Sequence, residues 1–143
     1  MQIPKSFKET MLKHALENYP NECCGVLGGL NNTATAHYPM QNAANSPYRY
    51  EFEGREHIEV SRQIEANNSE IMCIYHSHTG SEAQLSDTDL RLITYPDSYY
   101  LIISLMNLDQ PDFRAYKVQE LSGWTNDSPA TYGNPIEEFI DWV

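Results

Sequence analysis

The sequence feature that most constrains the fold is a short, uninterrupted apolar run, Ile-Met-Cys-Ile-Tyr at 71–75, followed at once by His-Ser-His. A run of this length, with no polar residue inside it, is typical of a strand that is buried on both faces of a sheet. Such a strand needs a packing layer above and below it. We therefore expect a central β-sheet flanked by helices.

The rest of the pattern predicts one domain of the α/β (α+β) class with a mixed central sheet. A length of 143 residues suits a single domain. The first predicted helix opens with a capping box, Ser6 and Glu9, and ends before Pro20, because a residue that precedes proline avoids the helical region. The predicted helices span 6–19, 56–66 and 86–94, and the predicted strands span 23–30, 33–40, 48–52, 71–75, 99–106 and 113–118.

The composition changes after Leu121, which divides the chain into a domain at 1–121 and an acidic C-terminal tail at 122–143. Residues 122–135 are rich in turn-forming types. From Val118 onward the sequence has five acidic residues and no Lys or Arg. We expect this tail to wrap the domain or to await a partner.

The charge balance argues against several classes of partner. The chain has 20 Asp and Glu against 9 Lys and Arg, a net charge of −11, whereas nucleic acids and anionic membranes both attract basic surfaces. No apolar run approaches the roughly 20 residues of a membrane span, and the N-terminus does not resemble a secretory signal. The three cysteines, Cys23, Cys24 and Cys73, include an adjacent pair, which favours a reducing cytoplasm over a disulfide framework.

The residues that carry chemistry follow the apolar run. His76 and His78 stand two apart at the end of a strand, so both imidazoles project from one face. Asp89 comes eleven residues later, in the first turn of the next predicted helix. Two imidazoles, one carboxylate and an open position for water make the usual arrangement of catalytic zinc. Two solvated histidines and an ordinary Ser86–Asp89 helix cap would explain the same residues without a metal.

The spacing of these residues resembles that of the JAMM (MPN-plus) zinc metalloproteases of the compact prokaryotic type. The pattern H-x-H, seven residues, S, two residues, D is present as His76, His78, Ser86 and Asp89. An upstream segment matches the family's P-x-E-x-C-G-x-L-x-G with Pro20, Glu22, Cys24, Gly25, Leu27 and Gly28. The resemblance covers about residues 3–118. The chain departs from the family at Thr79 and Leu85, where prolines are common, and we expect altered loop stiffness there without loss of chemistry.

The resemblance implies a cytidine-deaminase-like JAMM/MPN fold and a role for each motif residue. His76, His78 and Asp89 would hold Zn²⁺, with water as the fourth ligand. Glu22 would act as general base and then general acid, although most glutamates in such a loop are simply solvated. Ser86 would donate a hydrogen bond to the oxyanion of the tetrahedral intermediate.

The family also implies a function, a zinc-dependent peptidase or isopeptidase that cleaves after the C-terminal Gly-Gly of a ubiquitin-like or sulfur-carrier protein. The chain has little room for long insertions, so the substrate is expected to bind through one extended segment along a sheet edge. Two alternatives stay open, a cell-wall or phage-tail-associated peptidase and a non-catalytic MPN-type scaffold. The sequence leaves the individual substrate and the oligomeric state undetermined.

Overall fold

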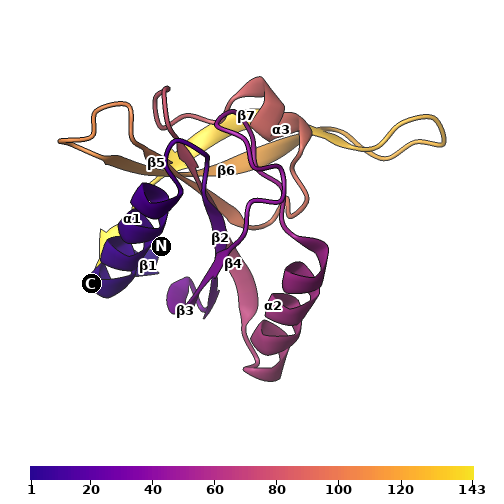
Figure 1. Cartoon of the computed structure of the whole chain (residues 1–143). Helices are drawn as coiled ribbons and strands as arrows, with labels where there is room; N and C mark the ends of the chain where they lie inside the picture. Colours follow the sequence, from indigo (N-terminus) through magenta and orange to yellow (C-terminus); the bar gives the residue numbers. More distant parts are fainter.

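The computed structural model describes all 143 residues and consists of an eight-stranded sheet and three helices (Figure 1). The helices are α1 (Lys5–Asn18), α2 (Gly54–Ala66) and α3 (Asp87–Arg91). The strands are β1 (Gln2–Ile3), β2 (Cys24–Leu30), β3 (Thr33–Met40), β4 (Glu70–His78), β5 (Tyr99–Ser104), β6 (Asp112–Ser122), β7 (Thr131–Glu138) and β8 (Asp141–Trp142). The sheet order is β7-β6-β5-β4-β2-β3-β1-β8 with both parallel and antiparallel pairs, which confirms the expected mixed sheet.

Strand β4 lies inside the sheet, between its antiparallel neighbour β2 and its parallel neighbour β5. Residues 72–78 are all buried, as the apolar run predicts. Helices α1 and α2 lie on opposite sides of the sheet (Figure 1): Met11 of α1 packs in one cluster with Tyr75, and Ile64 of α2 packs in another with Ile74. The strand that carries the histidines is therefore held from both faces.

Helix α1 begins after Pro4 and has no side-chain cap, so the predicted capping box of Ser6 and Glu9 is wrong. The helix starts at Lys5, which places Ser6 inside the first turn, beyond the position from which a side chain caps. The backbone N–H of Lys5 instead donates to the carbonyl of Val143, 3.0 Å away. The C-terminus of the chain thus helps to start the first helix.

The C-terminal segment 122–143 contributes two strands to the sheet, although the sequence predicts no strand beyond residue 118. Strand β7 pairs with β6 as one edge strand, and β8 pairs with β1 at the opposite edge. The hairpin that β6 and β7 form extends away from the body (Figure 1). The Trp142 ring packs against the core beside Phe113, with ring centroids 5.6 Å apart, whereas Trp124 and Phe139 are exposed. Edge strands gain main-chain hydrogen bonds from their neighbours, which turn-forming residue types do not reveal.

The predicted strand at 48–52 is also wrong, because only Phe52 forms an isolated bridge, with Asn42. The Asn42 side chain holds this segment as a loop. Its amide donates to the carbonyl of Arg49 (3.0 Å), and its Oδ1 accepts from the N–H of Glu51 (3.1 Å). Local side-chain bonds of this kind compete with strand pairing.

Candidate metal centre

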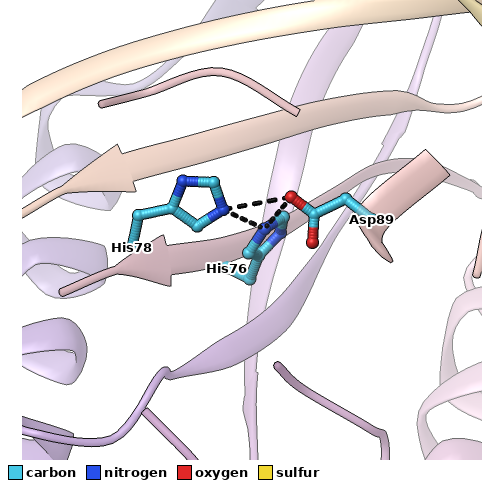
Figure 2. A group of neighbouring side chains, drawn as sticks. All are labelled: His76, His78 and Asp89. Atoms are coloured by element: carbon cyan, nitrogen blue, oxygen red, sulfur yellow. Dashed lines mark hydrogen bonds and ion pairs between the residues drawn. The ribbon is translucent and has the colours of Figure 1, made fainter. Parts of the chain in front are cut away.

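The end of strand β4 carries two histidines whose rings lie on one face of the sheet, as the spacing predicts (Figure 2). His76 is fully buried, and its ring stacks on Tyr50 with centroids 4.5 Å apart. His78 is only 5% exposed. Ser77 between them faces the other way, and its hydroxyl accepts from the N–H of Cys23 at 2.7 Å. The rings are therefore fixed by packing on the α2 side of the sheet.

Helix α3 places the carboxylate of Asp89 against both imidazoles. The Ser86 hydroxyl accepts from the Asp89 N–H (3.1 Å), and the Ser86 N–H donates to Asp89 Oδ2 (2.9 Å), which is the expected capping box. The same Oδ2 lies 3.2 Å from His76 Nε2 and 3.0 Å from His78 Nε2, and the two Nε2 atoms are 3.1 Å apart (Figure 2). The helix cap thus also positions the carboxylate, so capping and ligand geometry do not compete.

The donor atoms of these three residues fit a small divalent metal ion. The Nδ1 atom of His78 lies 2.8 Å from the carbonyl of Glu82, which can only accept, so Nδ1 carries the proton. Neutral His78 then presents the lone pair of Nε2 to Oδ2 of Asp89, and a shared cation satisfies both acceptors. Ligand atoms of a tetrahedral zinc at about 2.0–2.1 Å lie about 3.3 Å apart, close to the separations observed.

The charges of the centre also suit a cation. Burial acts to raise the pKa of Asp89, but His76, His78 and the Ser86 N–H stabilise the carboxylate more strongly and hold its pKa well below the usual range. Burial lowers the pKa of His76. Burial acts in the same direction on His78, but the nearby Asp89 carboxylate and the Glu82 carbonyl favour the protonated ring more strongly and raise the pKa of His78. The carboxylate is therefore an anion at neutral pH.

Glu22 lies two residues before the start of β2 and is 3% exposed, and its Oε1 has no hydrogen-bond partner within the chain. The Glu22 N–H donates to the Ser46 carbonyl (2.9 Å), and the Glu22 carbonyl accepts from the amide of Asn42 (3.0 Å). Burial raises the pKa of the Glu22 carboxyl to about 8. Glu22, His78 and Ser86 line one cleft of about 220 Å³. The structure thus brings together all five residues that the sequence singles out.

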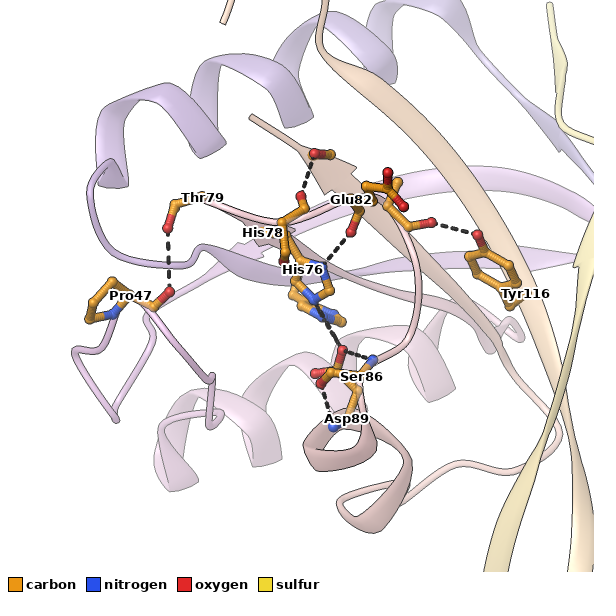
Figure 3. Close-up of polar contacts among 11 residues, drawn as sticks. Pro47, His76, His78, Thr79, Glu82, Ser86, Asp89 and Tyr116 are labelled. Carbon is orange, nitrogen blue, oxygen red and sulfur yellow. Dashed lines mark hydrogen bonds and ion pairs between the residues drawn. The ribbon is translucent and has the colours of Figure 1, made fainter. Parts of the chain in front are cut away.

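Sequence reasoning missed the side chains that hold the loop at 79–86 beside this cleft. The Thr79 hydroxyl donates to the carbonyl of Pro47 on the facing wall (3.3 Å), and Tyr116 donates to a carbonyl of the same loop (Figure 3). The Ser104 hydroxyl donates to another carbonyl there. None of these contacts has a sequence signal, because Ser and Tyr in strands and Thr in loops are ordinary residues.

The remaining histidines and the cysteines lie outside the centre. His14 Nδ1 and His37 Nε2 are each 2.7 Å from the hydroxyl of Tyr75, on the α1 side of the sheet. All three cysteines are buried and free. Each of them belongs to a core cluster and packs there as a small apolar residue.

The geometry of this site agrees with comparisons to known proteins. A family model described as prokaryotic homologues of the JAB domain matches residues 4–119. This chain belongs to the prokaryotic JAB family. The resemblance to JAMM proteases that the sequence motifs indicate is therefore confirmed, together with the JAB/MPN fold.

Individual JAB relatives support the assignment over most of the chain. The CysO-cysteine peptidase of Mycobacterium tuberculosis is 34% identical over 131 residues, which are 90% of this chain and 86% of that protein. The desampylase of Haloferax volcanii is 35% identical over 111 residues, 73% of this chain and 80% of that protein. These relatives confirm the expected enzyme class, a JAMM-type hydrolase.

Two solved structures share the JAB fold. The solution structure of protein DSY2949 from Desulfitobacterium hafniense has a TM-score of 0.80 and 29% identity, and the match covers 99% of this chain and 92% of that one. The crystal structure of a JAB1/MPN domain protein from Archaeoglobus fulgidus has a TM-score of 0.55 and 18% identity, and the match covers 82% of this chain and 89% of that one.

Proposed function

We propose that this chain is a zinc-dependent peptidase or isopeptidase that cleaves after the C-terminal Gly-Gly of a ubiquitin-like or sulfur-carrier protein. The observation that carries the proposal is the convergence of three ligand atoms beside an unpartnered carboxyl oxygen. His76, His78 and Asp89 supply the ligand atoms, and Glu22 supplies the carboxyl oxygen in the cleft.

His76, His78 and Asp89 would hold the metal, with the two Nε2 atoms and Oδ2 as its ligand atoms. A zinc ion bound there would supply Lewis-acid chemistry, by lowering the pKa of a coordinated water to near 7 and by polarising the scissile carbonyl. Glu22 accepts a proton from the attacking water and passes it to the leaving amine, and its buried oxygen is free for this contact.

The Ser86 hydroxyl is the second chain group that acts on the substrate. Its oxygen accepts from the Asp89 N–H, which leaves the hydroxyl proton free to be donated toward the cleft. A developing oxyanion is the acceptor that this proton would stabilise. One serine can therefore cap α3 and donate to the substrate at the same time.

The substrate class is supported by the relatives and by the shape of the site. Relatives named CysO-cysteine peptidase and desampylase align over most of the chain. The cleft is about 220 Å³ and is bounded by Pro47, Tyr48 and the loop with Gly80. An extended segment that ends in two glycines can enter a cleft of this size without clashes, because glycine has no side chain. None of the three helices has the length and apolar character that crossing a bilayer requires, and the cytoplasmic location stays a prediction.

The substitution Glu22→Gln tests the proposed chemistry. The amide has nearly the same shape but cannot accept the proton, so turnover of a Gly-Gly-terminated fusion protein should fall to background while zinc content stays at about one per chain. Glu65→Gln, an exposed change on α2, is the matched control and should cleave like the wild type. A Glu22→Gln protein with near-normal kcat would contradict the base assignment. A zinc-loaded wild type without turnover on Gly-Gly fusions would favour a non-catalytic scaffold.

A further inference from the structure

The loop that follows His78 is attached to the sheet through three consecutive backbone carbonyls. Each carbonyl accepts from a buried side chain, and the three side chains come from three neighbouring strands, β4, β5 and β6 (Figure 3). The pairs are Ser104 Oγ with Ser81 O at 2.6 Å, His78 Nδ1 with Glu82 O at 2.8 Å, and Tyr116 Oη with Ala83 O.

The middle contact matters for the metal centre. The Glu82 carbonyl accepts the proton of His78 Nδ1, which fixes both the tautomer and the rotation of the imidazole ring. Partners of this kind aim the ligating nitrogen, and their loss typically weakens metal binding 10–100-fold. The position of the Glu82 carbonyl therefore determines the direction in which the Nε2 lone pair of His78 points.

Within the loop, that carbonyl has one partner, the N–H of Gln84 at 2.9 Å, and this partner belongs to the same irregular segment. Residues 79–85 form no helix or strand, and Gly80, Ser81 and Glu82 are largely exposed. The two outer contacts are different, because Ser104 is 4% exposed and Tyr116 is 7% exposed. Ser104 is also the register partner of His78 between β4 and β5. The groups that fix the loop thus belong to the same rigid sheet that carries the histidine.

We propose that Ser104 and Tyr116 are positioning residues of the metal centre. They hold the carbonyls on either side of Glu82, and so keep the Glu82 carbonyl at Nδ1 of His78. This inference rests on the proposed function, since it assumes that His78 Nε2 is a metal ligand. Neither residue belongs to the group of candidate metal ligands.

Removal of either hydroxyl tests the proposal. Tyr116→Phe and Ser104→Ala should each weaken zinc binding about 10–100-fold in competition with a chromogenic chelator. The ring ¹⁵N signals of His78 in the metal-free protein should also change, because the population of the Nδ1–H tautomer falls. Ser104→Thr keeps a hydroxyl on the strand and should restore most of the affinity.

Ser98→Ala is the matched control. Ser98 is 6% exposed, and its hydroxyl donates to the carbonyl of Ile71 at 2.6 Å, the same kind of buried bond at the far end of β4. It should lose as much thermal stability as Ser104→Ala while zinc affinity stays at the wild-type value.

The outcomes distinguish failure of the positioning role from failure of the proposed function. If both test variants bind zinc as tightly as Ser98→Ala and leave the His78 signals unchanged, the positioning role is refuted. If the wild type itself binds no zinc, the proposed function fails instead. A loss of zinc affinity confined to Tyr116→Phe and Ser104→Ala supports the proposal.

Discussion

Gly25→Ala should destabilise the fold without weakening the metal centre. Gly25 pairs with Tyr75 across β2 and β4, and a Cβ at this position would lie 2.4 Å from the Cε1, Cζ and Oη atoms of Tyr75. The Tyr75 ring cannot easily move away, because it is fully buried. Its hydroxyl oxygen is also hydrogen-bonded to His14 Nδ1 and His37 Nε2, each 2.7 Å away. The glycine in the sequence motif is therefore a packing requirement of the sheet.

The expected cost follows from two contributions. The ring must shift by about 1 Å to reach an ordinary contact of about 3.5 Å, and overpacking of this kind costs about 1–3 kcal/mol. The same shift breaks the two hydrogen bonds of the Tyr75 hydroxyl, at about 1 kcal/mol each. The sum is about 3–5 kcal/mol, which corresponds to a Tm lower by roughly 9–15 °C for a domain of this size.

Urea denaturation measures this loss, with Gly54→Ala as the control, because no atom lies within 4 Å of a Cβ at Gly54. In a Tyr75→Leu background, Gly25→Ala should cost about 3–5 kcal/mol less, since the ring and the two hydrogen bonds of its hydroxyl are both absent there. Zinc affinity of the folded variant should equal that of the wild type, because Tyr75 packs on the α1 side, away from His76. A Gly25→Ala protein with wild-type stability, or strictly additive effects in the double variant, would refute the reasoning.

Three further predictions concern the metal, the C-terminus and the buried thiols. Zinc at 100 times its Kd should add about 2.7 kcal/mol of stability, and Asp89→Ala, with one ligand atom fewer, should show no zinc-dependent Tm shift in calorimetry. Deletion of 122–143 should unfold the domain, because Trp142 packs on the core and β7 covers β6; a truncated chain with native circular dichroism would contradict this. Burial raises the pKa of Cys23 and of Cys73 to about 12, so the folded state holds these protons more tightly than the unfolded chain. The contribution of these two thiols to the free energy of unfolding should therefore be complete below about pH 8.5 and decline as the pH rises toward 12; urea titrations of the wild type and of Cys73→Ala across this range measure the decline, which should be smaller in the variant.

The relative placement of the candidate ligand residues could be predicted from the sequence, through the family motif and because its geometry is local. A spacing of two on a strand fixes the relative direction of His76 and His78, and a spacing of three at a helix start fixes Asp89 to the cap residue Ser86. Each constraint links residues only two or three positions apart, so it does not depend on the tertiary structure. Only the docking of α3 onto the end of β4 needs tertiary structure.

The edges of the sheet could not be predicted, because their stability comes from distant partners. Strand β1 has two residues, Gln2 and Ile3, which are too few to show any period. It exists because it pairs with β3 on one side and β8 on the other. Strand β7 contains Asn134 and Pro135, which favour turns, yet it lies at the edge of the sheet, where a proline is tolerated.

The two departures from the JAMM pattern show why a motif mismatch beside a site need not disturb it. At position 79, where the family often has proline, the Thr79 hydroxyl donates to the Pro47 carbonyl across the cleft, a bond that proline cannot make. At position 85, Leu85 packs against two core clusters at once. A proline ring would restrict the backbone of this loop directly, whereas this chain anchors the loop through side-chain contacts. Neither residue makes a polar contact with His76, His78 or Asp89, so the two mismatches leave in place the groups that position the ligand atoms, which are β4, α3 and the Glu82 carbonyl.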